Sequence, residues 1–428
     1  MPTADPDATP IPTVNSFIST VLESPPSCIE FCPTMPRYFV VGTYNLTKDE
    51  ENPSDVSKQT REGSIMVFSL ESETNVVDSL YVYLLRKGSP LAVVLFMRFA
   101  RLMSIRKLHG TYTTESAVLD LHFAPGDHKF AVALSTGSIW IYSLKDLGSD
   151  LFNPNPAVKV TQDSILVLSL AWHPSPMRAT TIACSLSDGR VLVVDYSKPP
   201  YRRAYSNHSL EAWTVLWSPI RESDNSATLY SGGDDSQLRR LRTTLPPVKS
   251  IPAQPSMEGA EEHKSEPVEQ MEDTHISDAK THSAGVTAIL PIWTIYGEAL
   301  LTGSYDEFIR VLVSRTHRKW ANVAEKRLDG GVWRLKQMSA EGESDSKVSR
   351  WKVLASCMHA GSRILMITHR ENTWSIYVLA KFTEHESMNY GSDFILLATE
   401  EERWENRGTT IIASTSFYDR KLCIWKAP

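Results

Sequence analysis

One three-stretch unit recurs along the chain and decides what this sequence can fold into. Each copy has an alternating apolar stretch, a short turn, a second stretch with small residues, a tight polar turn and a third apolar stretch. The copies occupy residues 28–70, which is the loosest, 117–144, 165–196, 211–241, 285–313, 331–367 and 409–426. Apolar alternation over stretches of about five residues is typical of β-strands, and no helical period competes with it.

Seven such units in succession predict an all-β fold, a seven-bladed β-propeller of the WD-repeat type. The polar turns suit tight hairpins, as at Asp188-Gly189. The sequence ends just after the third stretch of the last copy, so the ring needs an outer strand from elsewhere. Residues 13–22 (TVNSFISTVL) have a suitable length and composition. We expect them to close the ring.

The expected domain is a single propeller over residues 13–428, preceded by a flexible tail at 1–12 that shows no signal-peptide pattern. Residues 245–280 are rich in Pro and acidic residues, and we expect them to form a disordered loop within the propeller. Residues 81–103 interrupt the repeats as an atypical insertion. Their apolar run, 91–97, is far shorter than the roughly 20 residues of a membrane span. An extra strand pair, a loose hydrophobic loop and an artefact of gene prediction all stay open for this insertion.

The composition excludes several classes of function. Because the chain has 44 Lys and Arg residues but 50 Asp and Glu residues, a broad basic surface that binds nucleic acid is not expected. Five cysteines are too few for a disulfide framework and point to a reducing compartment. The sequence has no G-x-S-x-G elbow, H-E-x-x-H motif, phosphate loop or dinucleotide fingerprint. Cys28 and Cys32 lack a second ligand pair, so no metal site is expected.

Three histidines each precede the first stretch of a copy and are matched by an aspartate in the later polar turn. In WD-type blades such residues form a buried structural pair, since buried charges must be paired. The expected pairs are His208 with Asp235, His282 with Asp306 and His385 with Asp419. We expect these six residues to stabilise blades rather than to act on a ligand.

Further polar and aromatic residues exceed what this framework needs. They stand at the starts of first stretches and in the turns between second and third stretches, positions that gather on one propeller face. These residues are Glu211, Trp213, Asp234, Tyr305, Glu307, Trp333, Arg334, His359 and Tyr390. Each alone is most simply a turn or rim residue. Together the acidic and aromatic ones suit a cationic ligand, because quaternary ammonium groups bind aromatic faces and carboxylates.

Several strings in chain order carry a family resemblance: HSLEAW, LYSGGDDSQL, LLTGSYDEFIRV, GGVWRLK, SCMHAG and ASTSFYDRKLCIWK. They resemble the WD-repeat diphthine methyl ester hydrolases of diphthamide biosynthesis, a family that also carries the name diphthine methyltransferase. The likeness covers residues 28–426. The chain departs from the family pattern at Leu241 and Leu312, which replace the blade-ending Trp, and at Phe394, where the family tends to have Trp.

The resemblance implies an activity that spacing and composition do not show. It is removal of the methyl ester from methylated diphthine, a modified histidine on elongation factor 2, which exposes the carboxylate for the final amidation. Elongation factor 2 is the implied partner, and no cofactor, nucleic acid or membrane is expected to take part. The protein itself is expected to be a cytoplasmic monomer. The substrate carries a trimethylammonium group. The implied substrate-binding residues are Glu211, Trp213, Asp234, Tyr305, Trp333 and Tyr390.

Hydrolysis needs an activated water and donors for the developing oxyanion. His359 or Glu307 is the candidate general base, and Arg334 or backbone N–H groups near Gly330-Gly331 are candidate oxyanion donors. The competing hypothesis is a non-catalytic WD-repeat scaffold or adaptor that binds partner proteins through the same face, because propellers host both roles.

Overall fold

The fold comes from a computed structural model. It describes residues 10–428 except 48–58, 86–91, 145–150, 153–157, 198–200, 220–225, 246–273, 295–296, 317–318, 342–347 and 398–407. These described residues form strands joined by turns, with one short 3-10 helix, η3 (Pro176–Arg178). Within these limits the chain forms no helix long and apolar enough to cross a membrane.

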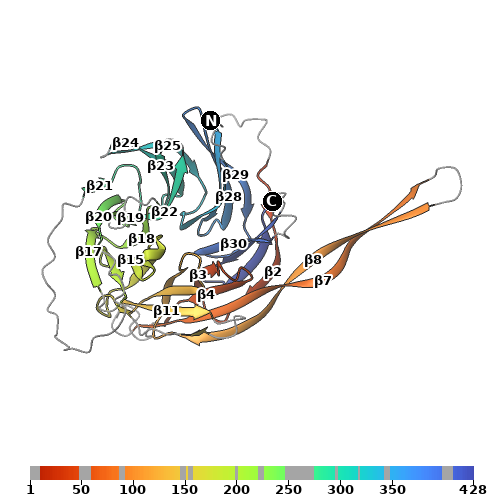
Figure 1. Cartoon of the computed structure of the whole chain (residues 1–428), viewed down its shortest axis with the longest axis horizontal. Helices are drawn as coiled ribbons and strands as arrows, with labels where there is room; N and C mark the ends of the chain where they lie inside the picture. Colours follow the sequence, from red (N-terminus) through yellow and green to blue (C-terminus); the bar gives the residue numbers. More distant parts are fainter. Residues whose placement is uncertain are drawn as a thin grey trace.

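Seven antiparallel sheets stand in a ring, each with its first strand toward the centre (Figure 1). The first blade consists of β3 (Pro26–Phe31), β4 (Tyr38–Thr43), β7 (Ser64–Leu85) and β8 (Ala92–Thr113). The second consists of β9 (Val118–Phe123), β10 (Lys129–Leu134) and β11 (Ser138–Leu144), with β12 (Leu151–Phe152) and β13 (Val158–Lys159) paired to the edge of β11. The third consists of β14 (Val167–Trp172), β15 (Thr181–Leu186), β16 (Arg190–Asp195) and β17 (Tyr201–Asn207).

The remaining blades repeat this order. The fourth and fifth are β18 (Ala212–Trp217), β19 (Ser226–Gly233), β20 (Leu238–Thr244) and β21 (Thr274–Asp278); and β22 (Val286–Thr294), β23 (Gly297–Ser304), β24 (Phe308–Thr316) and β25 (Lys319–Arg327). The sixth is β26 (Arg334–Glu341), β27 (Val348–Ser356), β28 (Ser362–Arg370) and β29 (Thr373–Phe382), and the seventh is β30 (Gly391–Leu397), β31 (Thr409–Thr415) and β32 (Lys421–Lys426). The all-β, seven-bladed propeller predicted from the repeats is confirmed.

The amino-terminal strands close the ring. Strand β2 (Ser16–Val21) pairs antiparallel with β32 as the outer strand of blade seven. Strand β1 (Thr13–Val14) pairs parallel with β29 and so also joins blade six. The predicted closure by residues 13–22 is therefore confirmed. A hydrogen bond from Lys381 N to Pro12 O (3.0 Å) extends this pairing into the last residue of the expected tail.

The structure describes parts of the two insertions and agrees with one of the alternatives left open for the first. Strands β7 and β8 pair from Ser64 opposite Thr113 to Leu85 opposite Ala92, and they leave the ring as a two-stranded arm (Figure 1). The described part of 81–103 is thus a strand pair. Residues 274–278, which we expected to be disordered, form β21 and cover the open edge of β20. The expectations for 1–9, 86–91 and 246–273 lie outside the described residues.

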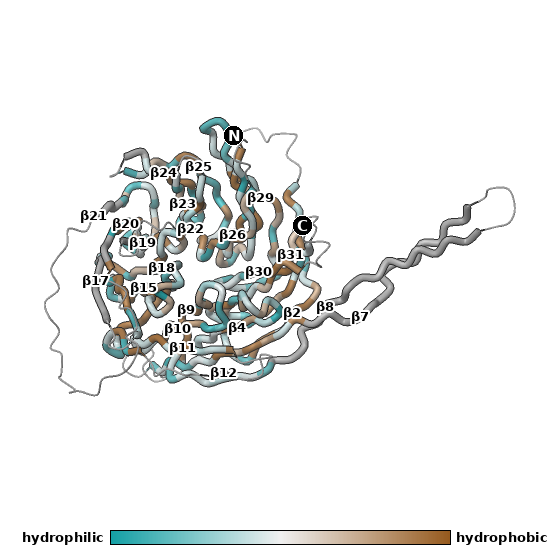
Figure 2. Tube along the Cα trace, in the orientation of Figure 1, coloured by the Kyte–Doolittle hydropathy of each residue, from teal (hydrophilic) through white to brown (hydrophobic). Residues whose placement is uncertain are grey.

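Neighbouring blades approach each other closely, which explains the small residues of each second stretch. A Cβ atom added at Gly232 would lie 2.6 Å from Val286 Cγ1, and one at Gly303 would lie 2.5 Å from Val332 Cγ1. Apolar side chains of adjacent blades fill the space between the sheets, and hydrophobic residues recur in strands all around the ring (Figure 2). The packed blades give rigid positions to the turns that carry the candidate site.

Candidate functional site

The first expected framework pair forms in blade four. His208 is buried before β18, and its Nδ1 lies 2.8 Å from Asp235 Oδ1. Its Nε2 lies 2.9 Å from Ser231 Oγ on β19. Burial lowers the pKa of His208, so the neutral ring links the turn to the strand. This residue is held by the blade and is not available to a ligand.

The second expected pair is corrected, because the structure gives Asp306 another partner. Arg310 Nη1 lies 2.9 Å from the Asp306 carboxylate, and the Ser283 N–H donates to it at 3.0 Å. His282 instead contacts Thr302 Oγ1 at 2.9 Å through Nε2. Burial lowers the pKa of His282 to about 4, so a neutral imidazole competes poorly with a guanidinium for the carboxylate.

The third pair works through a serine in blade seven. His385 Nε2 lies 2.8 Å from Ser414 Oγ, and its Nδ1 lies 2.9 Å from Ser416 Oγ. The Ser416 hydroxyl in turn donates to Asp419. Trp425 Nε1 donates to Ser414 Oγ at 3.0 Å and completes a buried chain of hydrogen bonds. His385 and Asp419 therefore stabilise the same blade without touching each other in a hydrogen bond.

Four of the predicted aromatic residues meet on one face, although they come from four blades. Trp333, before β26, lies at their centre, with its ring centroid 5.6 Å from Trp213, 5.9 Å from Tyr305 and 5.1 Å from Tyr390. Trp213 and Tyr305 lie 6.1 Å apart and nearly perpendicular. All four side chains are half-buried. We call these four residues the aromatic cluster.

The ring contacts continue toward blade one. Phe417, in the β31–β32 turn, lies 5.7 Å from Tyr390 and 6.0 Å from Tyr44, which follows β4. Tyr418 contacts Phe417 at 5.0 Å and is largely exposed. The sequence reasoning missed Phe417 and Tyr44. Phe417 was detectable, because it stands in the same polar turn of its blade as Tyr305 does in blade five.

Two predicted acidic residues lie beside the aromatic cluster. Trp213 Nε1 donates a hydrogen bond of 3.1 Å to Asp234 Oδ1, and Asp234 N donates to Glu211 O at 2.8 Å. Burial raises the pKa of Tyr305 above its ordinary value, and the charges of Asp234 and Glu211 add to the rise. Negative charge therefore lies close to the rings, the combination that favours a bound cation.

The two candidate bases lie apart from these contacts. Glu307 adopts a left-handed backbone (φ 71°), and its Oε2 accepts from Arg327 at 2.6 Å from Nη2 and 2.8 Å from Nε. That carboxylate is occupied at the rim by a guanidinium fork. His359 is exposed in the β27–β28 turn. Among the described residues, neither side chain hydrogen-bonds to the aromatic cluster or to Arg334.

Arg334 begins β26, and its side chain reaches from blade six to blade two. Its Nη2 lies 2.5 Å from Asp120 Oδ1, and its Nη1 lies 3.4 Å from His122 Nε2. His122 Nδ1 lies 2.9 Å from Glu30 Oε2 on β3. Lys336 Nζ continues the network, 3.5 Å from Glu30 Oε1. We call this network the ion cluster, and it also includes Asp393, whose Oδ1 lies 2.5 Å from Lys336 Nζ.

The ion cluster keeps His122 and Asp120 charged at neutral pH. Burial opposes ionisation of His122, but the carboxylates of Asp120 and Glu30 outweigh it and raise the pKa of His122 to about 9. Burial is likewise outweighed at Asp120, where Arg334 and His122 hold the pKa of the carboxyl well below its usual range. Of the cluster, the sequence reasoning selected Arg334 but missed Glu30, Asp120, His122 and Lys336. The missed signal is charged residues at alternate positions in apolar inner strands, as in DLH at 120–122 and RLK at 334–336.

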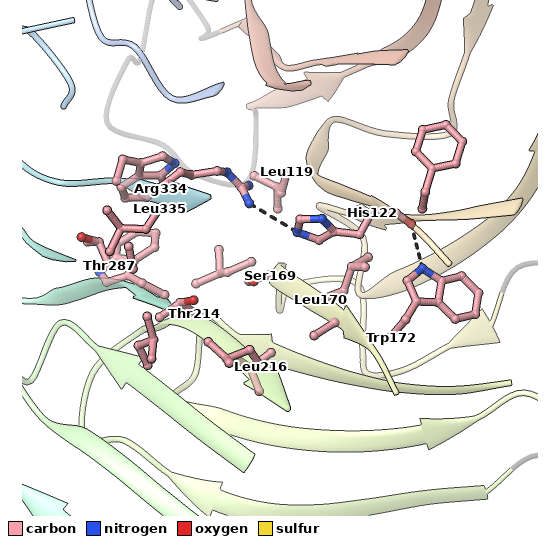
Figure 3. Close-up of a pocket in the computed structure, with 18 of the residues that line it drawn as sticks. Leu119, His122, Ser169, Leu170, Trp172, Thr214, Leu216, Thr287, Arg334 and Leu335 are labelled. Atoms are coloured by element: carbon pink, nitrogen blue, oxygen red, sulfur yellow. Dashed lines mark hydrogen bonds between the residues drawn. The ribbon is translucent and has the colours of Figure 1, made fainter. Parts of the chain in front are cut away.

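Two members of the aromatic cluster and two of the ion cluster line one cavity. A cavity of about 300 Å³ lies between the inner strands and is lined by Trp213 and Trp333 as well as His122 and Arg334. Figure 3 shows Arg334 and His122 extending toward each other at this cavity. In the described part of the chain, no group of His, Cys, Asp and Glu could hold a metal ion, and the five cysteines are buried and free.

Fold and site together define a WD-repeat type of seven-bladed propeller with an aromatic and ionic cavity between its inner strands. Similar solved structures include a chain of "Crystal Structure of Mitotic Checkpoint Complex", with a TM-score of 0.53 and 13% identity over 99% of this chain and 94% of that chain. The Cps50 (Swd1) β-propeller domain of Myceliophteria thermophila has a TM-score of 0.50 and 10% identity over 96% of this chain and 100% of that chain. At these identities the likeness concerns the fold alone.

No family model matches the chain. A curated relative is the diphthine methyltransferase of Schizosaccharomyces pombe, which is 30% identical over 313 residues, 72% of this chain and 78% of the relative. The chain belongs to the diphthine methyltransferase family.

Proposed function

We propose that this protein hydrolyses the methyl ester of methylated diphthine on elongation factor 2 and so prepares the carboxylate for the last step of diphthamide biosynthesis. Family membership supports a role in diphthine methyl chemistry. The observation that carries the proposal is the aromatic cluster, with Asp234 beside it and a cavity lined by Arg334 next to it. We expect the protein to act as a monomer in the cytoplasm.

The aromatic cluster would hold the trimethylammonium group of the substrate. A cation over an aromatic face gains about 0.5–2 kcal/mol, more when it is desolvated. Rings from four different blades can surround such a group better than a single strand could. The Asp234 carboxylate adds negative charge, and its hydrogen bond from Trp213 Nε1 holds it beside the ring. Glu211 contributes further negative charge to the same place.

The ester would then be hydrolysed by a positioned water. The water oxygen bonds to the carbonyl carbon while a base takes its proton, and the methoxide leaves as methanol after receiving a proton. Of the two candidate bases, His359 is the one we propose, because the Glu307 carboxylate is paired with Arg327. The turn of His359 packs against the loop that carries Trp333, since a Cβ atom at Gly331 would lie 2.7 Å from Met358 Sδ.

The oxyanion of the tetrahedral intermediate needs donors that are already in place. Arg334 is the proposed donor, because its guanidinium has five N–H groups and the structure engages only part of them with Asp120. The ion pair with Asp120 holds the guanidinium at the cavity rather than in solvent. No cofactor takes part in this hydrolysis.

A mass measurement tests the proposal directly. Purified protein is incubated with elongation factor 2 that carries the methylated intermediate, and the intact mass of the modified peptide is followed. Loss of one methylene equivalent supports the esterase, whereas stable binding with no mass change supports the scaffold alternative. The same measurement on elongation factor 2 from cells that lack the protein should show accumulated methyl ester. His359→Ala, if it folds normally, should lose the activity while retaining binding.

A further inference from the structure

We infer that His122 and Arg334 together form an anion site in the cavity, which takes the carboxylate released from the ester and the oxyanion that precedes it. This inference rests on the proposed function for the identity of its ligand. The sequence reasoning did not select His122. The cavity, the exposure of its charged groups and the directions of their donors support the site.

The ion cluster presents its positive groups to the cavity and keeps its negative groups behind them. The side chains of His122 and Arg334 are 34% and 27% exposed, and both line the cavity. Their partners Asp120 and Glu30 are 0% and 16% exposed. A ligand entering the cavity therefore meets two cations first, although the cluster as a whole has balanced charges. The structure thus favours an anion at this place.

The two cations also point donors at each other. Arg334 Nη1 and His122 Nε2 lie 3.4 Å apart. When His122 is protonated, both of its ring nitrogens are donors, so Nε2 cannot accept from Arg334. The Nδ1 donor is satisfied by Glu30, whereas within the described part of the chain the carboxylate contact of Nε2 is Asp120 Oδ2 at 3.4 Å, which is long for a hydrogen bond. An oxygen of a carboxylate bound between the two groups would accept from both.

The aromatic cluster and the anion site complement a zwitterion. Trp213 and Trp333 line the same cavity as His122 and Arg334. The methyl ester substrate carries the trimethylammonium cation but no carboxylate, whereas the hydrolysed product carries both. The site therefore matches the negatively charged intermediate and the product better than the neutral ester. This is the preference that accelerates a reaction, and it also predicts inhibition by product.

Small zwitterions measure this preference without elongation factor 2. The probes are trimethylglycine and 4-(trimethylammonio)butanoate, each compared by titration calorimetry at pH 7 with its own primary amide, which is neutral like the ester but is not hydrolysed. We expect the wild-type protein to bind at least one carboxylate about tenfold or more tightly than its amide. In His122→Gln the ratio should fall toward one. The matched control is His128→Gln, at an exposed histidine outside the cavity that contacts Asp127, and it should keep the wild-type ratio.

A measurement on the wild-type protein covers the case in which His122→Gln does not fold. Raising the pH from 7 to 10 deprotonates His122 through its pKa of about 9, and the carboxylate preference should fall. The charged groups that face His122 are Glu30 from β3, Asp120 on β9 and Arg334 from β26. The pKa values of Glu30 and Asp120 are lowered and that of Arg334 is raised, so none of these three groups titrates between pH 7 and 10.

The outcomes separate this inference from the proposed function. Equal binding of carboxylate and amide by the wild-type protein, or a preference that persists in folded His122→Gln or at pH 10, would overturn the anion site. If the ester of elongation factor 2 is still hydrolysed, the proposed function stands without it. If the carboxylate preference is found but no mass is lost from elongation factor 2, the anion site stands and the hydrolase proposal fails.

Discussion

Replacing Trp333 by leucine removes the centre of the aromatic cluster. Its ring contacts three others, at 5.6 Å to Trp213, 5.9 Å to Tyr305 and 5.1 Å to Tyr390. Leucine keeps an apolar side chain there but offers no π-face to a trimethylammonium group. The loss of one such cation–π contact costs about 1–2 kcal/mol in a partly desolvated site. Since 1.4 kcal/mol is a factor of ten, substrate binding should weaken roughly 5- to 30-fold.

The kinetic pattern should identify the role of the ring. Trp333 would hold the ammonium group equally in the substrate and in the transition state, so KM should rise while kcat changes little. The assay follows methyl ester loss by mass at several concentrations of elongation factor 2. The cluster also supports the fold, because each aromatic pair contributes about 0.5–1.5 kcal/mol. The free energy of unfolding should therefore be measured on the same preparation.

Trp374→Leu is the matched control. Trp374 lies on β29 of the same blade and stacks on Trp351 at 5.6 Å and on His369 at 4.4 Å. It should lose stability through similar ring contacts while KM stays at the wild-type value. The reasoning is refuted if Trp333→Leu, shown to be folded, has an unchanged KM. It is also refuted if Trp333→Leu weakens the binding of a substrate analogue with a neutral tert-butyl group as strongly as it weakens the binding of the cationic substrate.

Three further predictions concern the propeller itself. Arg334→Met leaves the buried Asp120 carboxylate without its guanidinium partner and should lower the free energy of unfolding by about 3–5 kcal/mol. The second substitution Asp120→Asn should recover most of this loss in denaturant titrations. If nothing is recovered, the pairing is contradicted. Burial lowers the pKa of His385 to about 4, so this residue should contribute a loss of stability on the order of 3 kcal/mol as the pH drops from 6.5 to 4. His385→Gln should remove that contribution and leave the similar one of His282, whose pKa is also about 4. A chain that lacks β2 (Ser16–Val21) should melt at a lower temperature and be cut sooner by protease than one that starts at Pro10, because β32 loses its outer partner strand. Equal resistance of the two chains would argue against closure of the ring by this strand.

The repeated strands were predictable from the sequence because they depend on local chemistry. Alternating apolar residues form a strand with two distinct faces whatever lies beyond the blade, and tight polar turns determine where the strand reverses. The number of blades follows from counting such units. The closing strand was predictable because an open edge at β32 needs a partner. The face that carries the candidate site was also predictable, because equivalent positions in repeated blades meet around one axis.

The partners of charged groups were decided only by the tertiary structure. Arg334 and Asp120 are 214 residues apart in the chain and meet across the ring, a contact that no spacing rule gives. Asp306 binds Arg310 rather than His282, and Glu307 binds Arg327, because a charged guanidinium is a stronger partner for a carboxylate than a neutral imidazole. The sequence alone determined which strands form and how many blades they make. The closed ring determined which charges are buried, paired or left facing the cavity, because that depends on distances between side chains from different blades.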